Sequence, residues 1–254
     1  MSRHRFFATA PLLDTAGTVV LPLSSADVHH AVRVLRVRPG EEVDIAEPGG
    51  RIWRVRVTSA DGEMVLAERL CEVEAEREPH VTLVFGVSKG SKNDDIIEGA
   101  VEVGVAETWP VFTARSVVKL DAEKREERGL RLRRVASAAA KQSKRASVPL
   151  VADPRDLADV LPLLAQFDLV LVAWEEASGL GFREAIALAP IAPDARVAVV
   201  VGPEGGLTAE EVAQLVGAGA VACTLGATIL RAETAGVVAT ALVVHELGGL
   251  GNVR

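Results

Sequence analysis

Polar and apolar residues alternate in the first part of the chain. Glu42–Ala46, Arg51–Ser59 and Glu63–Glu72 each alternate with a period of two, the pattern of β-strands that have one face in water. Turn-forming glycines separate these runs, so residues 1–73 are predicted to form a small β-barrel. We also expect a short strand at Thr18–Leu23 and a helix, capped by Ser24 or Ser25, that runs to about Arg36.

The pattern changes from Val81 onward, after a mostly acidic segment at residues 74–80 that is typical of a linker. The expected strands are now unbroken apolar runs that alternate with helices. Such strands are buried on both faces, so residues 81–254 are predicted to form an α/β domain with a parallel sheet between helices. The expected strands are Val81–Val87, Thr108–Phe112, Asp168–Ala173 and Arg196–Val201; the expected helices are Asp94–Val103, Asp121–Arg145, Leu180–Leu188, Thr208–Val216 and a last one from near Arg231 to about Leu247.

Two glycine-containing breaks interrupt apolar runs near the C-terminus. Val199–Glu211 reads VVVGPEGGLTAEE, and Thr224–Ala235 reads TLGATILRAETA. Glycine lets a ligand approach bare backbone, and open α/β sheets bind ligands at the carboxyl ends of their strands. We therefore expect the two breaks to lie side by side and to hold a small molecule, while a tight turn without a ligand remains the alternative. Thr208 and Glu211 are spaced as a capping box for the helix after the first break.

The second break also contains charged residues that suggest contact with a substrate. Arg231 and Glu233 stand at the expected start of the last helix, where a cation opposes the helix dipole. An arginine in a locally unfavourable place suggests that it reaches a substrate, although a surface ion pair with Glu233 is an alternative. In the first break, the acidic Glu204 disfavours a bound phosphate and favours a neutral or cationic ligand.

Composition narrows the possible environments and partners. Cys71 and Cys223 have neither disulfide-framework nor metal-ligand spacing, so we expect no metal and a reduced, cytoplasmic setting. The apolar segment Ala235–Val244 is too short to span a bilayer, so no membrane association is expected. The net charge is −7, yet residues 115–145 carry 11 basic and 4 acidic side chains, a net +7. This block suggests a local contact with a polyanion, unless it is only a solvated helix face.

Three shorter basic segments have the composition of nucleic-acid contacts. KGSK places Lys89 and Lys92 just after an expected strand, and a solvated loop is the alternative. KQSKR ends the long helix, where cations are favoured by the helix dipole in any case. RHRFF at the N-terminus combines cations with aromatic rings, which suits RNA, although Phe6 and Phe7 are also typical core residues.

Together these segments resemble one protein family along nearly the whole chain. The motifs are RHRFF, KGSKNDDIIEGAVEVGV, AKQSKRASVP, VGPEGGLT and LGATILRAETA, in that order. They are similar to the RsmE family, the small-subunit (16S) rRNA uridine N3-methyltransferases of the SPOUT class. The chain departs from the family pattern at Lys141 and Lys144, where an acidic residue and glycine are expected, and at Val101 and Val103. These departures concern the RNA contacts and not the glycine breaks.

The resemblance implies a fold, a cofactor and partners. The fold is a SPOUT-type parallel sheet with a C-terminal trefoil knot, preceded by a PUA-like RNA-binding barrel. The cofactor is S-adenosylmethionine (SAM), and the partners are 16S rRNA, within the 30S subunit, and a second copy of the chain. The implied catalytic residues are Arg231, Glu233 and Thr234; the cofactor site is Val201, Gly202, Glu204, Gly205, Gly206, Leu225, Gly226, Ile229 and Leu230; and the RNA contacts are Arg3, Arg5, Lys89, Lys92, Lys141 and Arg145.

Two other functions remain open on the sequence. One is a SPOUT ribose 2′-O-methyltransferase acting on tRNA or rRNA, against which the segment ILRAETA argues. The other is a ribosome-binding protein that keeps the fold without catalysis, against which the intact glycine breaks and Arg231 argue.

Overall fold

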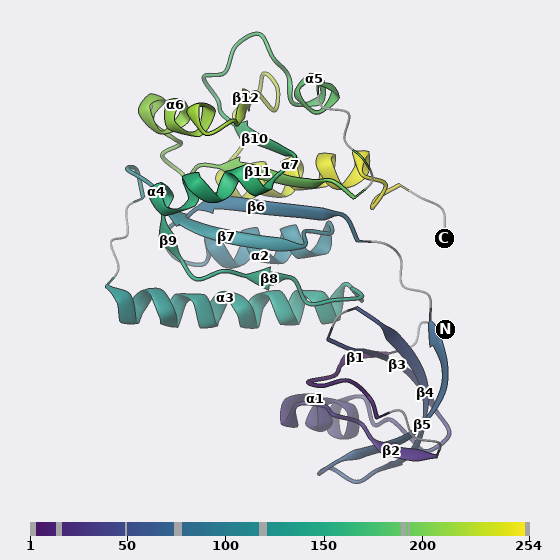
Figure 1. Ribbon diagram of the computed structural model, residues 1–254. Helices are drawn as coiled ribbons and strands as arrows, with labels where there is room; N and C mark the ends of the chain where they lie inside the picture. Colours follow the sequence, from purple (N-terminus) through teal and green to yellow (C-terminus); the bar gives the residue numbers. More distant parts are fainter. Residues whose placement is uncertain are drawn as a thin grey trace. The chain divides into compact units, whose positions relative to one another are not determined.

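The computed structural model describes residues 4–13, 17–48, 50–73, 78–116, 121–188, 192 and 194–251. The chain divides into two compact units. The first comprises Met1–Arg77 and Ala140–Val148, and the second comprises Glu78–Ala139 and Pro149–Arg254. Both units contain a β-sheet, and their strands and helices are labelled in Figure 1.

The first unit contains a five-stranded β-sheet, in the part of the chain where we predicted a small barrel. Within the described residues its strands are ordered β1-β3-β4-β5-β2, with β1 parallel to β3 and the other pairs antiparallel. An isolated antiparallel bridge between Ala8 and Leu23 joins the segments that follow the two outer strands, β1 and β2. Alternate residues such as Val43, Ile45, Val55 and Val57 fill the interior. The strands are β1 (Arg5–Phe7), β2 (Thr18–Val20), β3 (Glu42–Ala46), β4 (Ile52–Ala60) and β5 (Val65–Val73).

A helical segment covers part of this sheet. It consists of α1 (Ser25–His29) and a π-helical turn η1 (His30–Val34). Of the two predicted caps the structure uses Ser24, whose hydroxyl oxygen accepts a hydrogen bond from the amide of Asp27 at 3.1 Å. The helix ends two residues before the predicted Arg36, because Arg36 adopts a left-handed conformation with φ of 53°.

Residues 140–148 belong to the first unit, although we predicted them within a domain running from 81 to 254. Arg5 donates hydrogen bonds to the backbone carbonyls of Lys144 and Arg145, the latter at 3.1 Å. Lys141 pairs with the buried Asp27 at 2.6 Å. These contacts join positions more than 100 residues apart, so local sequence patterns do not reveal them.

The second unit contains the predicted parallel sheet. Within the described residues its order is β12-β10-β11-β6-β7-β8, with β9 beside β7, and each of these pairs is parallel. We expected the two glycine breaks to lie side by side. The strands that precede them, β11 and β12, are however not neighbours, because β10 lies between them. The strands are β6 (His80–Gly86), β7 (Glu107–Phe112), β8 (Leu150–Val151), β9 (Arg155–Asp156), β10 (Leu169–Ala173), β11 (Arg196–Val201) and β12 (Val221–Cys223).

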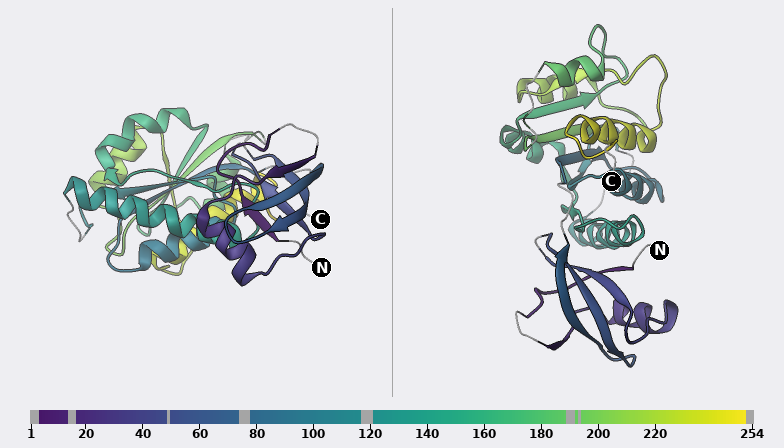
Figure 2. Two further views of the ribbon diagram at one scale, coloured as in Figure 1. Left: turned by 90° about the horizontal axis from the view of Figure 1, so that it is seen from below. Right: turned by 90° about the vertical axis from the view of Figure 1, so that its right-hand side faces the viewer.

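Helices cover both faces of this sheet. On one face, Val84, Val172 and Val200 pack in a cluster with residues of α4, of the 3₁₀ turn η2 and of α6. On the other face, α7 packs against β6, β11 and α2, and α2 and α7 lie on the same side in Figure 2. The predicted long helix ends at Gln142 and not at Arg145. The helices are α2 (Lys92–Glu102), α3 (Ala122–Gln142), α4 (Leu157–Val160), η2 (Leu161–Gln166), α5 (Phe182–Ala187), α6 (Ala209–Gly217) and α7 (Ala232–Glu246).

Close contact between α2 and α7 depends on a glycine. A Cβ atom on Gly99 would lie 2.5 Å from Cγ2 of Val237, so the two helices approach closely only because position 99 has no side chain. Among the described residues, no helix combines the length and the apolar character needed to cross a bilayer.

Candidate functional site

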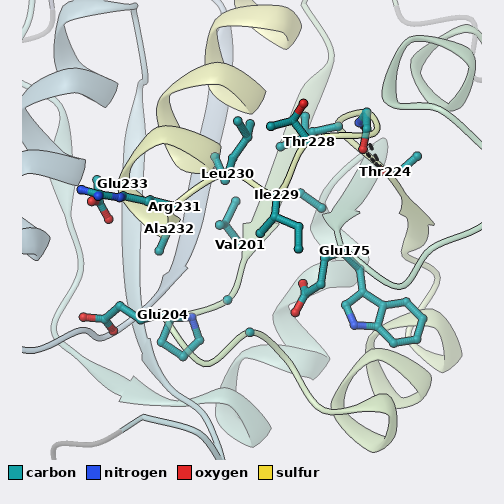
Figure 3. Close-up of a pocket in the computed structure, with 18 of the residues that line it drawn as sticks. Glu175, Val201, Glu204, Thr224, Thr228, Ile229, Leu230, Arg231, Ala232 and Glu233 are labelled. Carbon is teal, nitrogen blue, oxygen red and sulfur yellow. Dashed lines mark hydrogen bonds between the residues drawn. The ribbon is translucent and has the colours of Figure 1, made fainter.

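A cavity of about 650 Å³ opens at the carboxyl ends of the parallel strands of the second unit (Figure 3). Its walls come from the segments that follow β10, β11 and β12, and from Lys92 at the start of α2. The register explains why these segments meet: Ala173 at the end of β10 pairs with Val201 of β11 and with Cys223 of β12. The three strands therefore end at the same level. The carboxyl ends of the strands are the usual ligand site in an open α/β sheet.

The β11–α6 loop forms the floor of the cavity and is folded tightly on itself. A Cβ atom on Gly202 would lie 2.8 Å from the carbonyl carbon of Gly206 and 2.9 Å from the nitrogen of Leu207. Gly206 has a φ of 71°, and a side chain there would collide with the carboxylate of Glu175. Only glycines permit this loop shape, and they leave bare backbone facing the cavity.

A capping box fixes the end of the same loop, as the sequence predicts. The hydroxyl of Thr208 accepts a hydrogen bond from the amide of Glu211 at 3.2 Å, and the carboxylate of Glu211 accepts one from the amide of Thr208 at 2.9 Å. The other carboxylate oxygen of Glu211 accepts a hydrogen bond from the amide of Ala114 at 2.7 Å. Glu211 thus fixes the C-terminal end of the loop to α6 and to the segment that follows β7.

Gly205 does not line the cavity, although we expected it in the cofactor site. Its carbonyl accepts a hydrogen bond from the guanidinium of Arg115 at 2.8 Å, and a Cβ atom on it would lie 3.1 Å from Cβ of Arg115. It therefore faces away from the cavity. The predicted residues Val201, Gly202, Glu204 and Gly206 do line it.

The β12–α7 loop forms the opposite wall. Thr224 stabilises its first turn, because its hydroxyl donates to the carbonyl of Gly226 at 3.0 Å and accepts from the amide of Gly226 at 3.2 Å. Leu225, Gly226, Ile229 and Leu230 all line the cavity, as predicted. Ile229 is 84% exposed, so this wall presents apolar surface to its surroundings.

Charged side chains gather at one side of the cavity. Figure 3 shows Glu204, Arg231 and Glu233 together on that side, and Glu175, Thr224 and Thr228 on the other. Arg231 is exposed and immediately precedes α7, as the sequence predicts. One carboxylate oxygen of Glu233, Oε2, is buried and has no hydrogen-bond partner among the described residues. A buried carboxylate oxygen without a partner is costly, which marks a place where a ligand donor fits.

Lys92 also belongs to this charged side. Its ammonium group lies 3.2 Å from a carboxylate oxygen of Glu204, so the two side chains form an ion pair at the cavity wall. The pKa of Glu204 lies below its ordinary value: partial burial raises it, but the Ser88 hydroxyl, the backbone of Glu204 and Lys92 together lower it further. Glu204 is therefore ionised at neutral pH.

Trp174 and Glu175 follow β10 and line the cavity, although we did not predict them as site residues. Their signal was present, since Asp168–Ala173 was predicted as an unbroken apolar strand. Using it required knowing that β10 lies between β11 and β12. Thr234, which we expected to be catalytic, is exposed on α7 and does not line the cavity, unlike its neighbours Glu233 and Ala235.

The residues predicted to contact RNA lie in several different places. Lys92 lines the cavity, whereas Lys89 is exposed and does not. Arg5 and Lys141 make internal contacts in the first unit, and Arg145 is buried. Arg3 lies outside the described residues. Contact of these residues with RNA stays a prediction.

Within the described ranges, no group of three or more His, Cys, Asp or Glu side chains is arranged to hold a metal ion. The cavity instead combines glycine-lined backbone, apolar walls and five charged side chains. Three of these are acidic (Glu175, Glu204 and Glu233) and two are basic (Lys92 and Arg231). This lining suits an organic ligand with an apolar body and a positive centre.

Comparison with known proteins shows which protein family the chain resembles. A family model described as an RNA methyltransferase domain matches residues 76–244, and one described as an RNA methyltransferase PUA domain matches residues 23–68. The curated protein "Ribosomal RNA small subunit methyltransferase E" of Bacillus subtilis is 32% identical over 97% of this chain and 97% of its own. The protein of the same name from Mycobacterium tuberculosis is 35% identical over 92% of this chain and 88% of its own.

A solved structure supports the same relationship. The crystal structure of a ribosomal RNA small subunit methyltransferase E from Neisseria gonorrhoeae, bound to S-adenosyl methionine, superimposes with a TM-score of 0.81. The two sequences are 30% identical, and the match covers 95% of this chain and 97% of the Neisseria gonorrhoeae chain. The likeness therefore includes both the parallel sheet and the N-terminal sheet.

Proposed function

This chain belongs to the ribosomal RNA small subunit methyltransferase E family, and we propose that it transfers the methyl group of SAM to N3 of one uridine of 16S rRNA. The observation that carries the proposal is the cavity at the strand ends, where two glycine-broken loops meet Arg231 and Glu233. The glycine side takes the methyl donor, and the charged side takes the acceptor base.

The lining residues fit SAM in shape and charge. Gly202, Gly206 and Gly226 expose backbone groups to a polar ligand, while Val201, Leu225 and Leu230 offer an apolar wall to its adenine. The excess of acidic over basic side chains around the cavity favours a positively charged centre. When bound, SAM supplies an electrophilic methyl group on a positively charged sulfur.

Arg231 and Glu233 handle the charge of the acceptor. N3 of uridine carries a proton at neutral pH, and this proton must leave before the nitrogen attacks. The unpartnered Oε2 of Glu233 is an acceptor for it, and the guanidinium of Arg231 stabilises the negative charge that develops on O2 or O4 of the base. Because N3 lies on the pairing edge, the uridine must enter the cavity unpaired.

The decisive experiment is to incubate the protein with isotope-labelled SAM and unmodified 30S subunits, and to locate the methyl group by mass spectrometry of digested rRNA. We expect one methyl group per subunit, on N3 of a uridine. A methyl group on a ribose 2′-oxygen would support the ribose methyltransferase instead. Binding to the subunit with no transfer would support a ribosome-binding protein without catalysis.

A variant tests the role of Arg231. We expect Arg231→Ala to abolish transfer while SAM affinity, measured by calorimetry, changes by no more than a few-fold, because the side chain serves the acceptor and not the donor. Arg183→Ala is the matched control, since Arg183 is exposed on α5 and does not line the cavity. Normal turnover in Arg231→Ala would refute the assignment.

The proposal extends to the topology of the second unit. We infer that its C-terminal segment forms a trefoil knot. In support, the chain runs from β11 to the edge strand β12, and then returns through α7 to pack against β6, β11 and α2. A single-molecule experiment that pulls the N- and C-termini apart tests for the knot, because a knotted chain has a shorter fully extended length than an unknotted one.

The assembly and setting are proposed in the same way. We infer that the protein acts as a homodimer, which would cover exposed apolar residues such as Ile229 and Leu242, and that its substrate is rRNA within the 30S subunit in the cytoplasm. The PUA domain contributes RNA binding. The proposed functional division is residues 1–73, a linker at 74–80, and residues 81–254, except that residues 140–148 pack with the first unit. Sedimentation equilibrium at micromolar concentration tests the dimer, and a purely monomeric protein would contradict it.

A further inference from the structure

A second cavity, of about 380 Å³, lies in the same unit between the start of α2 and the first half of α3. It shares no lining residue with the cavity at the strand ends. Three of its lining side chains are basic and two are acidic; the full set is Gly90, Asn93, Asp94, Lys124, Glu127, Arg128, Arg131 and Leu132.

Arg128 is the cation in this cavity that lacks a carboxylate partner. Within the described part of the chain its guanidinium makes one hydrogen bond, to the neutral carbonyl of Ser88 at 3.3 Å, and no ion pair. Partial burial and, secondly, the charge of Arg131 lower the pKa of Arg128, against a smaller opposite effect of Asp94. The carboxylate of Asp94 already accepts two hydrogen bonds from Arg131. Arg128 is thus held beside another cation, an arrangement that an anion would stabilise.

Lys124 is the third basic residue of the cavity, after Arg128 and Arg131. Its ammonium group lies 3.0 Å from Asp121, and both side chains are more than half exposed. Such an exposed pair is weak, so Lys124 can turn to an anion in the cavity at little cost. Gly90, which also lines the cavity, has a φ of 67°, and a Cβ atom on it would meet nothing within 4 Å, so the wall is open at this position.

One turn of the chain, residues 88–92, separates the two cavities. Lys92 lines the cavity at the strand ends, while Gly90 lines the second one. The turn is fixed from inside: the side-chain oxygen of the buried Asn93 accepts from the amide of Ser88 at 2.8 Å, and its amide group donates to the Ser88 carbonyl at 2.7 Å. Two hydrogen bonds of one buried side chain therefore hold the turn between the cavities.

We propose that this second cavity binds a backbone phosphate of the rRNA, close to the nucleotide that enters the first cavity, with Arg128 as its main ligand and Lys124 at the rim. A planar guanidinium matches two phosphate oxygens, and one separating turn suits neighbouring nucleotides of one strand. This site gives the basic block at residues 115–145 a specific role. It rests on the proposed function, because that function makes RNA the partner.

Arg128→Gln tests the site, and Arg134→Gln is its matched control. Arg134 is the same residue type on the same helix, is exposed, and does not line the cavity. The probe is 30S subunits that carry unmodified 16S rRNA, whose affinity for the full-length protein is measured without SAM over a range of KCl concentrations. For Arg128→Gln we expect weaker binding, and a slope of log affinity against log salt that is smaller by about 0.7–0.9, the loss of one phosphate contact. The control keeps the wild-type slope.

Each outcome decides the proposal. Equal losses in Arg128→Gln and Arg134→Gln would mean a diffuse basic surface and would overturn it, as would an unchanged slope in Arg128→Gln. SAM affinity, measured by calorimetry, reports folding of the variant; if Arg128→Gln lowers it, the exposed Lys124→Gln replaces that variant with the same expectation. Because the readout is binding, a wild-type protein that binds rRNA without methylating it would refute the proposed function and still measure this phosphate contact.

Discussion

Replacing Gly202 by alanine tests the link between the tight β11–α6 loop and SAM binding. The added Cβ atom would lie 2.8 and 2.9 Å from backbone atoms of Gly206 and Leu207, whereas ordinary contacts of this kind measure 3.4–4 Å. Backbone atoms cannot rotate away, so the loop must open by roughly half an ångström or more. Overpacking of this kind costs about 1–3 kcal/mol.

This cost has two measurable consequences. For a unit of this size, about 2 kcal/mol lowers Tm by about 4–8 °C. If the loop relieves the strain by opening, SAM must close it again, and about 2 kcal/mol corresponds to a roughly 30-fold higher Kd. Differential scanning calorimetry measures the first effect, and isothermal titration calorimetry with SAM measures the second.

Gly217→Ala is the control for this substitution. Gly217 ends α6, and a Cβ atom there would meet nothing within 4 Å. We expect the control to retain SAM affinity and to be as stable as the wild type or slightly more so, since alanine is a better helix former. If Gly202→Ala keeps both Tm and SAM affinity at wild-type values, the loop does not shape the donor site.

Three further outcomes are expected. Because the pKa of Glu204 is lowered in the folded protein, its ionised carboxylate stabilises the fold above the ordinary glutamate range, and this stabilisation is lost as the pH falls through the lower folded-state pKa. Carboxyl NMR titration should therefore show no change in Glu204 between pH 7 and pH 5. Replacing its ion-pair partner, Lys92→Met, should raise the pKa of Glu204. Gly99→Ala should destabilise the protein by about 1–3 kcal/mol in urea unfolding, because of contact with Val237, and Val237→Ala should restore part of that loss; strict additivity of the two changes would contradict the contact. Burial raises the pKa of the Cys223 thiol to about 12, whereas Cys71 is exposed, so iodoacetamide at pH 8 should modify one thiol per native chain, and modification of both would show that Cys223 is accessible.

Features that depend on neighbouring residues could be predicted from the sequence. Alternation predicted β3, β4 and β5, and unbroken apolar runs predicted β6, β7, β10 and β11, whereas the short strands β1, β8, β9 and β12 were not predicted. The capping box of Thr208 and Glu211 and the start of α7 after Arg231 both follow from residue types within one helical turn. The glycine breaks pointed to the carboxyl ends of the strands, and the cavity lies there.

Which residues line the cavity was harder to predict from the sequence. Glycines 202, 205 and 206 look equivalent in the sequence, yet Gly205 faces Arg115 and the other two line the cavity. The orientation of each residue in a turn depends on φ and ψ, which one-letter sequence does not specify when the residue is glycine. Similarly, Lys92 looked like a loop cation, and its ion pair with Glu204 joins residues more than 100 positions apart.

The sequence by itself determined the two kinds of sheet, the glycine-broken strand ends and the charged start of the last helix, because side-chain alternation and turn chemistry act over a few residues. Only the tertiary structure decided that β10 lies between β11 and β12, which brings Trp174 and Glu175 into the cavity, and that residues 140–148 join the first unit. The physical reason is that the central strands are apolar on both faces, so their local pattern specifies burial and leaves the choice of neighbour to the packing of the whole chain.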